Sequence, residues 1–133
     1  RPSSLVGSEM CIRDRYKGGD IKQLKLSLVK NNILVLLSDQ DARGKGVLSK
    51  FFEIDSSTHS GAAILSKRND SPIIYASITK KDEFYEIEFI KIDTSGSIND
   101  IVQQYTAEIE KTIIKNPEQY FWFHKRWKSV RKY

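Results

Sequence analysis

The sequence predicts an α/β fold in which helices cover a partial mixed sheet. Three observations support this prediction. Apolar residues recur at spacings of three and four across residues 97–115, which is the periodicity of an amphipathic helix. Residues 33–37 form a continuous apolar run of strand length, and residues 84–92 alternate in polarity as a half-buried strand does. The 133 residues suffice for one domain with a sizeable core.

A helix and a buried strand are expected first. The helix covers residues 20–31 and is capped by Asp20. The run at residues 33–37 is expected to be a strand buried on both faces, as in sheets with helices on each side. Residues 39–57 are expected to form a long polar loop at the carboxyl end of that strand, where α/β proteins tend to bind ligands.

The second half of the chain is expected to contain a hairpin between two helices. Thr58 or Ser60 can cap a helix over residues 61–68, which Pro72 and the polar residues before it end. Strands are predicted at residues 72–79 and 84–92, joined by a turn at 80–83 and therefore antiparallel. Ser97 and Asp100 form a capping-box pattern at the start of the helix that extends to Lys115.

The segment 116–128 combines a helix start with five aromatic residues, one histidine and three cations. Asn116 suits an N-cap and Pro117 the first helical position, so a short helix is predicted. Three interpretations remain open for its side chains. They could pack on a sheet with the cations solvated, bind nucleic acid by stacking and phosphate contacts, or meet an anionic membrane interface.

Composition excludes several classes of protein. No apolar run approaches the roughly 18 residues of a membrane-spanning helix, so none is predicted. A single cysteine, Cys11, excludes an intrachain disulfide framework. No phosphate-binding loop, serine-hydrolase motif or Cys/His metal spacing is present, so no cofactor and no metal site is predicted. The net charge of +5 favours anionic partners without selecting among them.

Residues 1–15 differ from the rest of the chain. They contain three Arg and no Lys, whereas residues 16–133 contain fifteen Lys and four Arg. They show no helical or strand periodicity and resemble a translated sequencing adapter. We therefore expect 1–15 to be a non-native tail and 16–133 to be the protein itself; the alternative is a short native tail.

Four blocks of the sequence occur in an order that is familiar from one family. They are Ser38-Asp-Gln-Asp41, Val47-Leu-Ser-Lys-Phe-Phe52, Thr58-His-Ser-Gly-Ala-Ala-Ile-Leu65 and Pro117-Glu-Gln-Tyr-Phe-Trp-Phe-His-Lys-Arg-Trp-Lys128. They resemble blocks of the lipid A biosynthesis acyltransferases, the lauroyl and myristoyl transferases, over about residues 18–128. Lys50, Glu53, Tyr75 and Lys80 depart from that pattern: the family usually has Pro, Gly, Pro and Arg there.

The resemblance implies a fold, a reaction and partners. The chain would be the C-terminal part of a glycerolipid-acyltransferase-like α/β domain. The whole protein would transfer a fatty acyl chain from acyl carrier protein to a hydroxyl of an anionic lipid A precursor. It would act at the cytoplasmic face of the bacterial inner membrane, with a membrane anchor upstream.

The resemblance also implies which residues contact substrate. The superfamily's catalytic His-x4-Asp/Glu motif fits neither His59 nor His124, so no catalytic residue is expected in this chain. The motif should precede residue 16. This piece alone is therefore expected to be inactive. Substrate contacts are expected at Asp39, Gln40, Asp41, Glu118, Gln119, His124, Arg126 and Lys128. Asp39 could instead cap a turn, and Arg126 could pair with Trp122. The competing function is a non-catalytic, basic and aromatic nucleic-acid-binding module.

Overall fold

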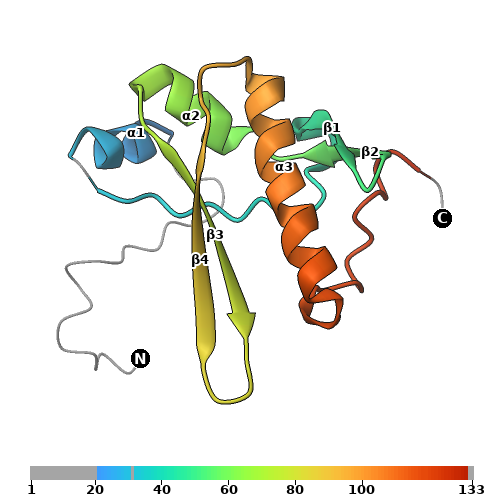
Figure 1. The fold of residues 1–133 in the computed structure, drawn as a ribbon. Coiled ribbons are helices and arrows are strands. Elements are labelled where there is room, and N and C mark those ends of the chain that lie inside the picture. Colours follow the sequence, from blue (N-terminus) through green and yellow to red (C-terminus); the bar gives the residue numbers. More distant parts are fainter. Residues whose placement is uncertain (1–20, 31, 132–133) are drawn as a thin grey trace, which may run out of the picture. The chain divides into compact units, whose positions relative to one another are not determined.

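The computed structural model describes residues 21–30 and 32–131. The expected tail at residues 1–15 and the cap at Asp20 lie outside them. The chain divides into two compact units, Arg1–Leu34 and Val35–Tyr133. Helix α1, Ile21–Val29, belongs to the first unit and confirms the first predicted helix. All other helices and strands belong to the second unit (Figure 1).

A β-hairpin occupies the segment that was predicted to be a polar loop. A 3-10 turn, η1 (Arg43–Lys45), leads into strand β1 (Val47–Phe51), which pairs antiparallel with β2 (Ile54–Thr58). The loop prediction for residues 39–57 is therefore wrong. The hairpin turn consists of Phe52 and Glu53, with φ angles of 50° and 60°. Both are left-handed, as a two-residue type I′ turn requires, although neither residue is Gly or Asn.

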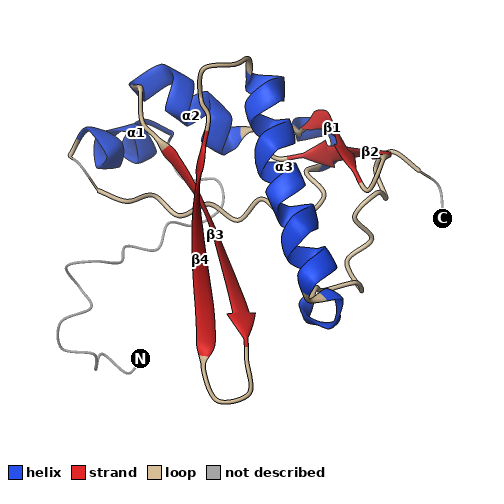
Figure 2. Ribbon diagram, viewed as in Figure 1, coloured by secondary structure: helices blue, strands red, loops and turns tan. Residues whose placement is uncertain are grey.

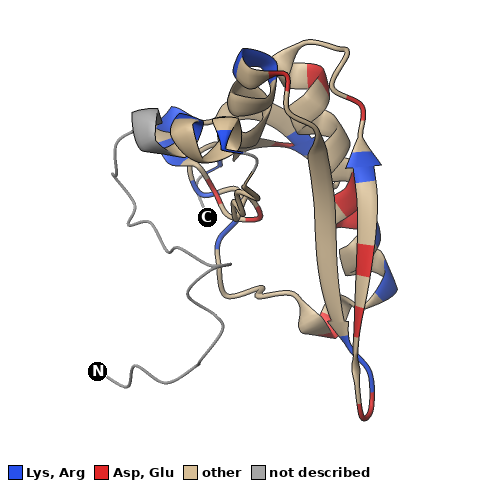
Figure 3. Ribbon diagram, turned by 90° about the vertical axis from the view of Figure 1, so that its left-hand side faces the viewer, with Lys and Arg blue, Asp and Glu red and all other residues tan. Residues whose placement is uncertain are grey.

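The second hairpin was predicted correctly. Helix α2 (Gly61–Asn69) precedes strands β3 (Ile73–Lys80) and β4 (Tyr85–Ile92), which pair antiparallel along their whole length (Figure 2). One face of this hairpin packs towards α3, while the other carries exposed apolar side chains, of which Ile78 and Ile87 lie directly opposite each other: Ile74, Ile78, Ile87 and Phe89. In Figure 3, the acidic and basic positions of the hairpin lie along β4 and at the connecting turn, while β3 is charged only at its end.

Helix α3 (Ile98–Lys115) organises the core of the second unit. Its capping box is present, as predicted: the Asp100 N–H donates to Ser97 Oγ at 3.3 Å, and the Ser97 N–H donates to Asp100 Oδ2 at 2.8 Å. The helix contacts both hairpins and α2. Two apolar clusters form along it: Ala63, Ile92, Ile101, Val102 and Tyr105 in one, and Phe51, Ile109 and Ile113 in the other. The α/β class is therefore confirmed, as two separate antiparallel sheets covered by helices.

The predicted buried strand at residues 33–37 is absent from the described structure. The segment has no strand partner, and Ile33 is 92% exposed. The boundary between the two units falls inside this run, after Leu34. Periodicity alone could identify an apolar run, but a strand also needs neighbours that satisfy its backbone groups.

The predicted helix over residues 116–128 is also wrong. Only Pro117–Gln119 forms a 3-10 turn, η2, and irregular turns follow to residue 130. Asn116 makes no side-chain cap. Tyr120, Arg126 and Trp127 all lie against the Phe51 ring. A helix would place Arg126 roughly 120° around its axis from Tyr120, so tertiary contact with Phe51 overrides the local helix signals.

Candidate functional site

Two segments about eighty residues apart in sequence meet in the second unit. We call their contact the Asp41–His124 junction; it joins residues 39–43 to residues 120–129. The Asp41 N–H donates to His124 Nε2 at 2.9 Å, and Tyr120 Oη donates to the carbonyl of Asp39 at 3.2 Å. Ser129 Oγ donates to Asp41 Oδ1 in a short hydrogen bond. Residues 120–129 thus bind both backbone and side-chain atoms of the Asp39–Asp41 turn.

Asp41 is the centre of the junction. The residue is 6% exposed, and it forms an isolated antiparallel bridge with Thr58. Burial raises the pKa of Asp41, but the hydrogen bonds from Ser129 and the Arg43 N–H, with the positive charges of Arg126 and Lys128, outweigh burial and leave the pKa below its ordinary value. The carboxyl is therefore ionised at neutral pH, and its Oδ2 is buried without a hydrogen-bond partner.

His124 enters the junction as a hydrogen-bond acceptor. Because Nε2 accepts the Asp41 N–H, that nitrogen carries no proton, and the neutral imidazole must carry its proton on Nδ1. Burial and the neighbouring charge of Lys128 lower the pKa of His124, while Asp41 opposes them. The structure therefore favours a neutral imidazole, which is the form that this hydrogen bond requires.

Arg126 is buried beneath the junction, with 2% of its surface exposed. Its Nη1 donates to the carbonyl of Ser57 at 2.7 Å and its Nη2 to Thr58 Oγ1 at 2.5 Å. Its guanidinium carbon lies 5.1 Å from the centre of the Phe51 ring. The alternative interpretation paired Arg126 with Trp122; the structure places Arg126 over Phe51, and Trp122 packs edge-on against Tyr120.

The Arg126 contacts continue into a chain of hydroxyl groups. A guanidinium can only donate, so Thr58 Oγ1 accepts from Arg126. The same hydroxyl is also hydrogen-bonded to Ser49 Oγ, 2.7 Å away, and either of the two hydroxyls can donate. Burial lowers the pKa of Arg126, and no carboxylate lies within ion-pair distance of it in the described part of the chain. Its Nε is buried without a partner. Arg126 thus forms hydrogen bonds with β2 and no ion pair within the described residues.

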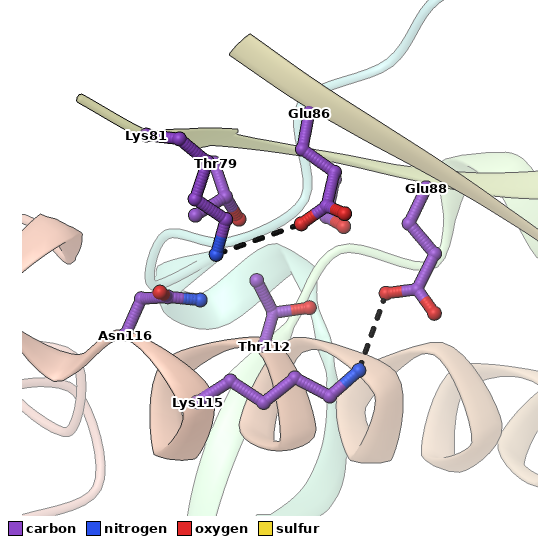
Figure 4. Close-up of a pocket in the computed structure, with 8 residues that line it drawn as sticks. Thr79, Lys81, Glu86, Glu88, Thr112, Lys115 and Asn116 are labelled. Atoms are coloured by element: carbon purple, nitrogen blue, oxygen red, sulfur yellow. Dashed lines mark hydrogen bonds and ion pairs between the residues drawn. The ribbon is translucent and has the colours of Figure 1, made fainter. Parts of the chain in front are cut away.

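A separate polar pocket of about 210 Å³ lies between the β3–β4 hairpin and the C-terminal end of α3 (Figure 4). Lys81 lies 3.6 Å from Glu86, and Lys115 reaches Glu88 at 3.4 Å. Both lysines of the pocket are thus matched by carboxylates. A phosphorylated ligand would find no excess positive charge there, and none of the predicted site residues lines it.

The sequence pattern of the bacterial lipid A biosynthesis acyltransferases matches residues 7–129, which include both segments of the junction. The chain belongs to this family. The matched range begins inside the 1–15 segment whose composition differs from the rest. The family assignment rests on most of the chain rather than on one motif.

Two curated relatives are similar to this chain. The lipid A biosynthesis palmitoleoyltransferase of Escherichia coli strain K12 is 28% identical over 110 residues, which cover 77% of this chain and 36% of that protein. The lipid A biosynthesis acyltransferase of Shigella flexneri gives the same figures. The chain therefore spans about a third of the length of the curated relatives that it matches.

The junction gathers only some of the residues expected to contact substrate. Asp39, Asp41, His124 and Arg126 meet there, and the charge of Lys128 acts on both Asp41 and His124. Gln40 is exposed beside them. Gln119 lies elsewhere: its amide oxygen accepts the Lys80 N–H at 2.8 Å and its amide nitrogen donates to the Lys80 carbonyl at 3.0 Å. Glu118 is exposed next to it.

Several residues of the junction were not predicted as site residues from the sequence. Tyr120 and Thr58 belong to the blocks that carry the family resemblance, but their contacts depend on pairing between distant segments. Ser129 follows the last block and carries no signal of its own.

Two further features are absent from the described residues. No group of three or more His, Cys, Asp or Glu side chains that could hold a metal ion occurs in residues 21–30 and 32–131. No helix in the same ranges is long and apolar enough to cross a membrane.

Proposed function

We propose that this chain is the C-terminal part of an enzyme that transfers a fatty acyl chain from acyl carrier protein to a hydroxyl of an anionic lipid A precursor. The family to which the chain belongs supports acyl transfer in lipid A biosynthesis. The donor and the acceptor hydroxyl come from the family resemblance. The catalytic His-x4-Asp/Glu motif is expected upstream of this sequence, so the chain alone should not transfer acyl groups.

One observation carries the site part of this proposal. The Ser38–Asp41 block and the Pro117–Lys128 block, which resemble the family separately in sequence, are hydrogen-bonded to each other in the structure. The lowered pKa values of Asp41 and His124 at this contact favour a shared site over two independent turns. We assign Asp39, Gln40 and Asp41 to the wall of the acyltransferase cleft.

The exposed cations and aromatics of the C-terminal segment fit a membrane-bound, phosphorylated acceptor. Phe123 is 91% exposed, and Phe121 packs against it with 5.9 Å between ring centres. Lys125 and Lys128 follow within the same turns and are also exposed. Aromatic rings and cations in this combination suit the headgroup region of an anionic membrane. We therefore place this segment at the inner-membrane surface.

The first experiment is to read the source DNA upstream of the codon for Tyr16. An open frame that encodes His-x-x-x-x-Asp or His-x-x-x-x-Glu is the expected result. A stop codon with a native start near residue 16 would contradict the proposal, because the protein would then lack its general base.

The second experiment measures acyl transfer by the longest encoded protein, with acylated carrier protein as donor and a lipid A precursor as acceptor. Asp41→Asn and Gln40→Ala probe the cleft wall, and Asp82→Asn serves as a control because Asp82 is exposed in the β3–β4 turn, outside every segment assigned to the site. We expect the two cleft variants to lose activity and the control to retain it. Full activity in Asp41→Asn would remove Asp41 from the site.

A further inference from the structure

We infer that His124 is a positioning residue whose neutral imidazole holds the Asp39–Asp41 turn in place, rather than a residue that contacts substrate. The role of His124 rests on the described geometry alone. Only its consequence for acyl transfer rests on the proposed function. The positioning role is an alternative to the expectation that His124 contacts the acidic acceptor or the carrier of the acyl donor.

The hydrogen bond uses the only nitrogen of His124 that could act as a base here. Nε2 accepts the backbone N–H of Asp41 at 2.9 Å, so its lone pair is occupied. A phosphate contact through Nε2 would require that nitrogen to carry a proton, and the neutral ring keeps only its Nδ1–H as a donor. Protonation of Nε2 would remove the acceptor that the structure gives to the Asp41 N–H, and a partly buried N–H would be left unpaired.

Other bonds show that the turn itself is what the C-terminal segment holds. Tyr120 Oη binds the carbonyl of Asp39, and Ser129 Oγ binds the carboxylate of Asp41. Three side chains of one irregular segment therefore contact a backbone N–H, a backbone carbonyl and a carboxylate of the same turn. A segment that only packed apolar rings would not need polar atoms at these three places.

The charges around His124 favour the neutral form. Lys128 and Arg126 from its own segment disfavour protonation, as does burial, while Asp41 and Asp39 from the facing turn favour it. The pKa of His124 is lowered, so burial and the charges of Lys128 and Arg126 outweigh the charges of the two aspartates. Acidification protonates His124 and breaks the Asp41 hydrogen bond, because an imidazolium has no acceptor.

The chain contains two histidines, which makes a direct test by NMR practical. The His59→Gln variant leaves one imidazole and thereby assigns the spectrum. Long-range nitrogen–proton correlations above neutral pH should show His124 with its proton on Nδ1. An Nε2-protonated tautomer, or an imidazolium that persists above pH 7, would overturn the inference.

Hydrogen exchange of the Asp41 amide gives the second measurement. His124→Gln can still present an oxygen acceptor and cannot be protonated, whereas His124→Ala removes the acceptor. The Asp41 amide should exchange about 5- to 10-fold faster in the Ala variant, and the Gln variant should restore protection. Equal exchange in the wild type and His124→Ala would also overturn the inference. If His124→Ala does not fold, the wild-type tautomer and the Gln variant still decide it.

Acyl transfer by the longer enzyme then separates positioning from substrate contact. His124→Gln should keep most of the activity that His124→Ala loses, with the KM for the glycolipid unchanged in both. A raised KM in His124→Gln would indicate direct contact with the acceptor and would refute the positioning role. If no acyl transfer is detected at all, the proposed function fails, and the tautomer and exchange results still stand by themselves.

Discussion

Replacement of the buried Arg126 should give an unusual order of stabilities, in which Arg126→Met is tolerated better than Arg126→Lys. Each hydrogen bond from a charged donor contributes about 1.5–3 kcal/mol, and Arg126 makes two, to Ser57 and Thr58. The contact with Phe51 adds about 1–2 kcal/mol for a desolvated pair. Against these stands the desolvation of an ion that is 2% exposed, which costs several kcal/mol.

These opposing contributions nearly cancel, so Arg126→Met should change the free energy of unfolding by no more than about 2 kcal/mol. Ser57 O keeps the Ala42 N–H at 3.1 Å and Thr58 Oγ1 keeps Ser49, so neither loses its last partner. Arg126→Lys retains the desolvation cost but loses one hydrogen bond and the planar contact, which amounts to about 3 kcal/mol.

Urea denaturation followed by tryptophan fluorescence measures both variants. Arg131→Met is the matched control, because Arg131 is exposed and its replacement should change stability by less than about 0.5 kcal/mol. If Arg126→Lys is more stable than Arg126→Met, the charge itself is worth more than its desolvation cost, and the reasoning fails.

Four further outcomes are expected. Glu53→Gly should raise the free energy of unfolding by about 0.5–1 kcal/mol in the same denaturation assay, because the Glu53 backbone is left-handed at φ 60° and a glycine there is unstrained. A loss of stability would show that the turn is not strained. Stability should fall as the pH drops below 6.5, the ordinary pKa of histidine, because the lowered pKa of His124 in the folded protein means that the unfolded chain binds more protons than the folded one. Melting temperatures measured across this pH range should depend less steeply on pH in His124→Gln than in the wild type. Filter binding should detect only weak association with RNA at physiological salt, whereas tight binding with a steep salt dependence would favour the nucleic-acid-binding alternative. Phe89→Thr should reduce self-association in sedimentation experiments, since this ring is 68% exposed on the apolar hairpin face.

The elements that were predicted well are those whose signals are local. Helix α3 begins within one residue of the predicted start, because Ser97 and Asp100 cap it and its apolar stripe repeats without interruption. The β3–β4 hairpin follows from alternation and from the turn residues between its strands. These patterns depend on neighbours within about four positions, so the sequence alone contains them.

The β1–β2 hairpin could not be predicted in the same way. Apart from Phe51, its buried positions are hydroxyl residues, Ser49, Ser56, Ser57 and Thr58, rather than an alternating apolar set. These residues are buried because they hydrogen-bond one another and because Arg126, 68 positions away, donates to Thr58. A polar stretch that is satisfied by a distant cation is indistinguishable from a loop when it is read locally.

The sequence pointed to several residues of the junction but not to the way in which they contact one another. The family blocks contained Asp41, His124 and Arg126, yet a helical model of residues 116–128 gave His124 and Arg126 one common role as ligand contacts. The irregular turns instead give them opposite chemical roles. His124 accepts from a backbone N–H, and Arg126 donates into the hydroxyl groups of β2.

The junction also contains two buried polar atoms without hydrogen-bond partners, which a segment selected only for stability would avoid. Asp41 Oδ2 and Arg126 Nε are buried without partners, and each such atom costs about 1–3 kcal/mol. They are the only buried side-chain atoms of this kind in the described residues, and both belong to residues whose charges act on each other. Local rules of hydrogen bonding tend to be broken at functional sites. An Arg126→Met variant that folds normally but impairs acyl transfer would therefore separate the two roles, because the fold would have lost little and the site would have lost its fixed geometry.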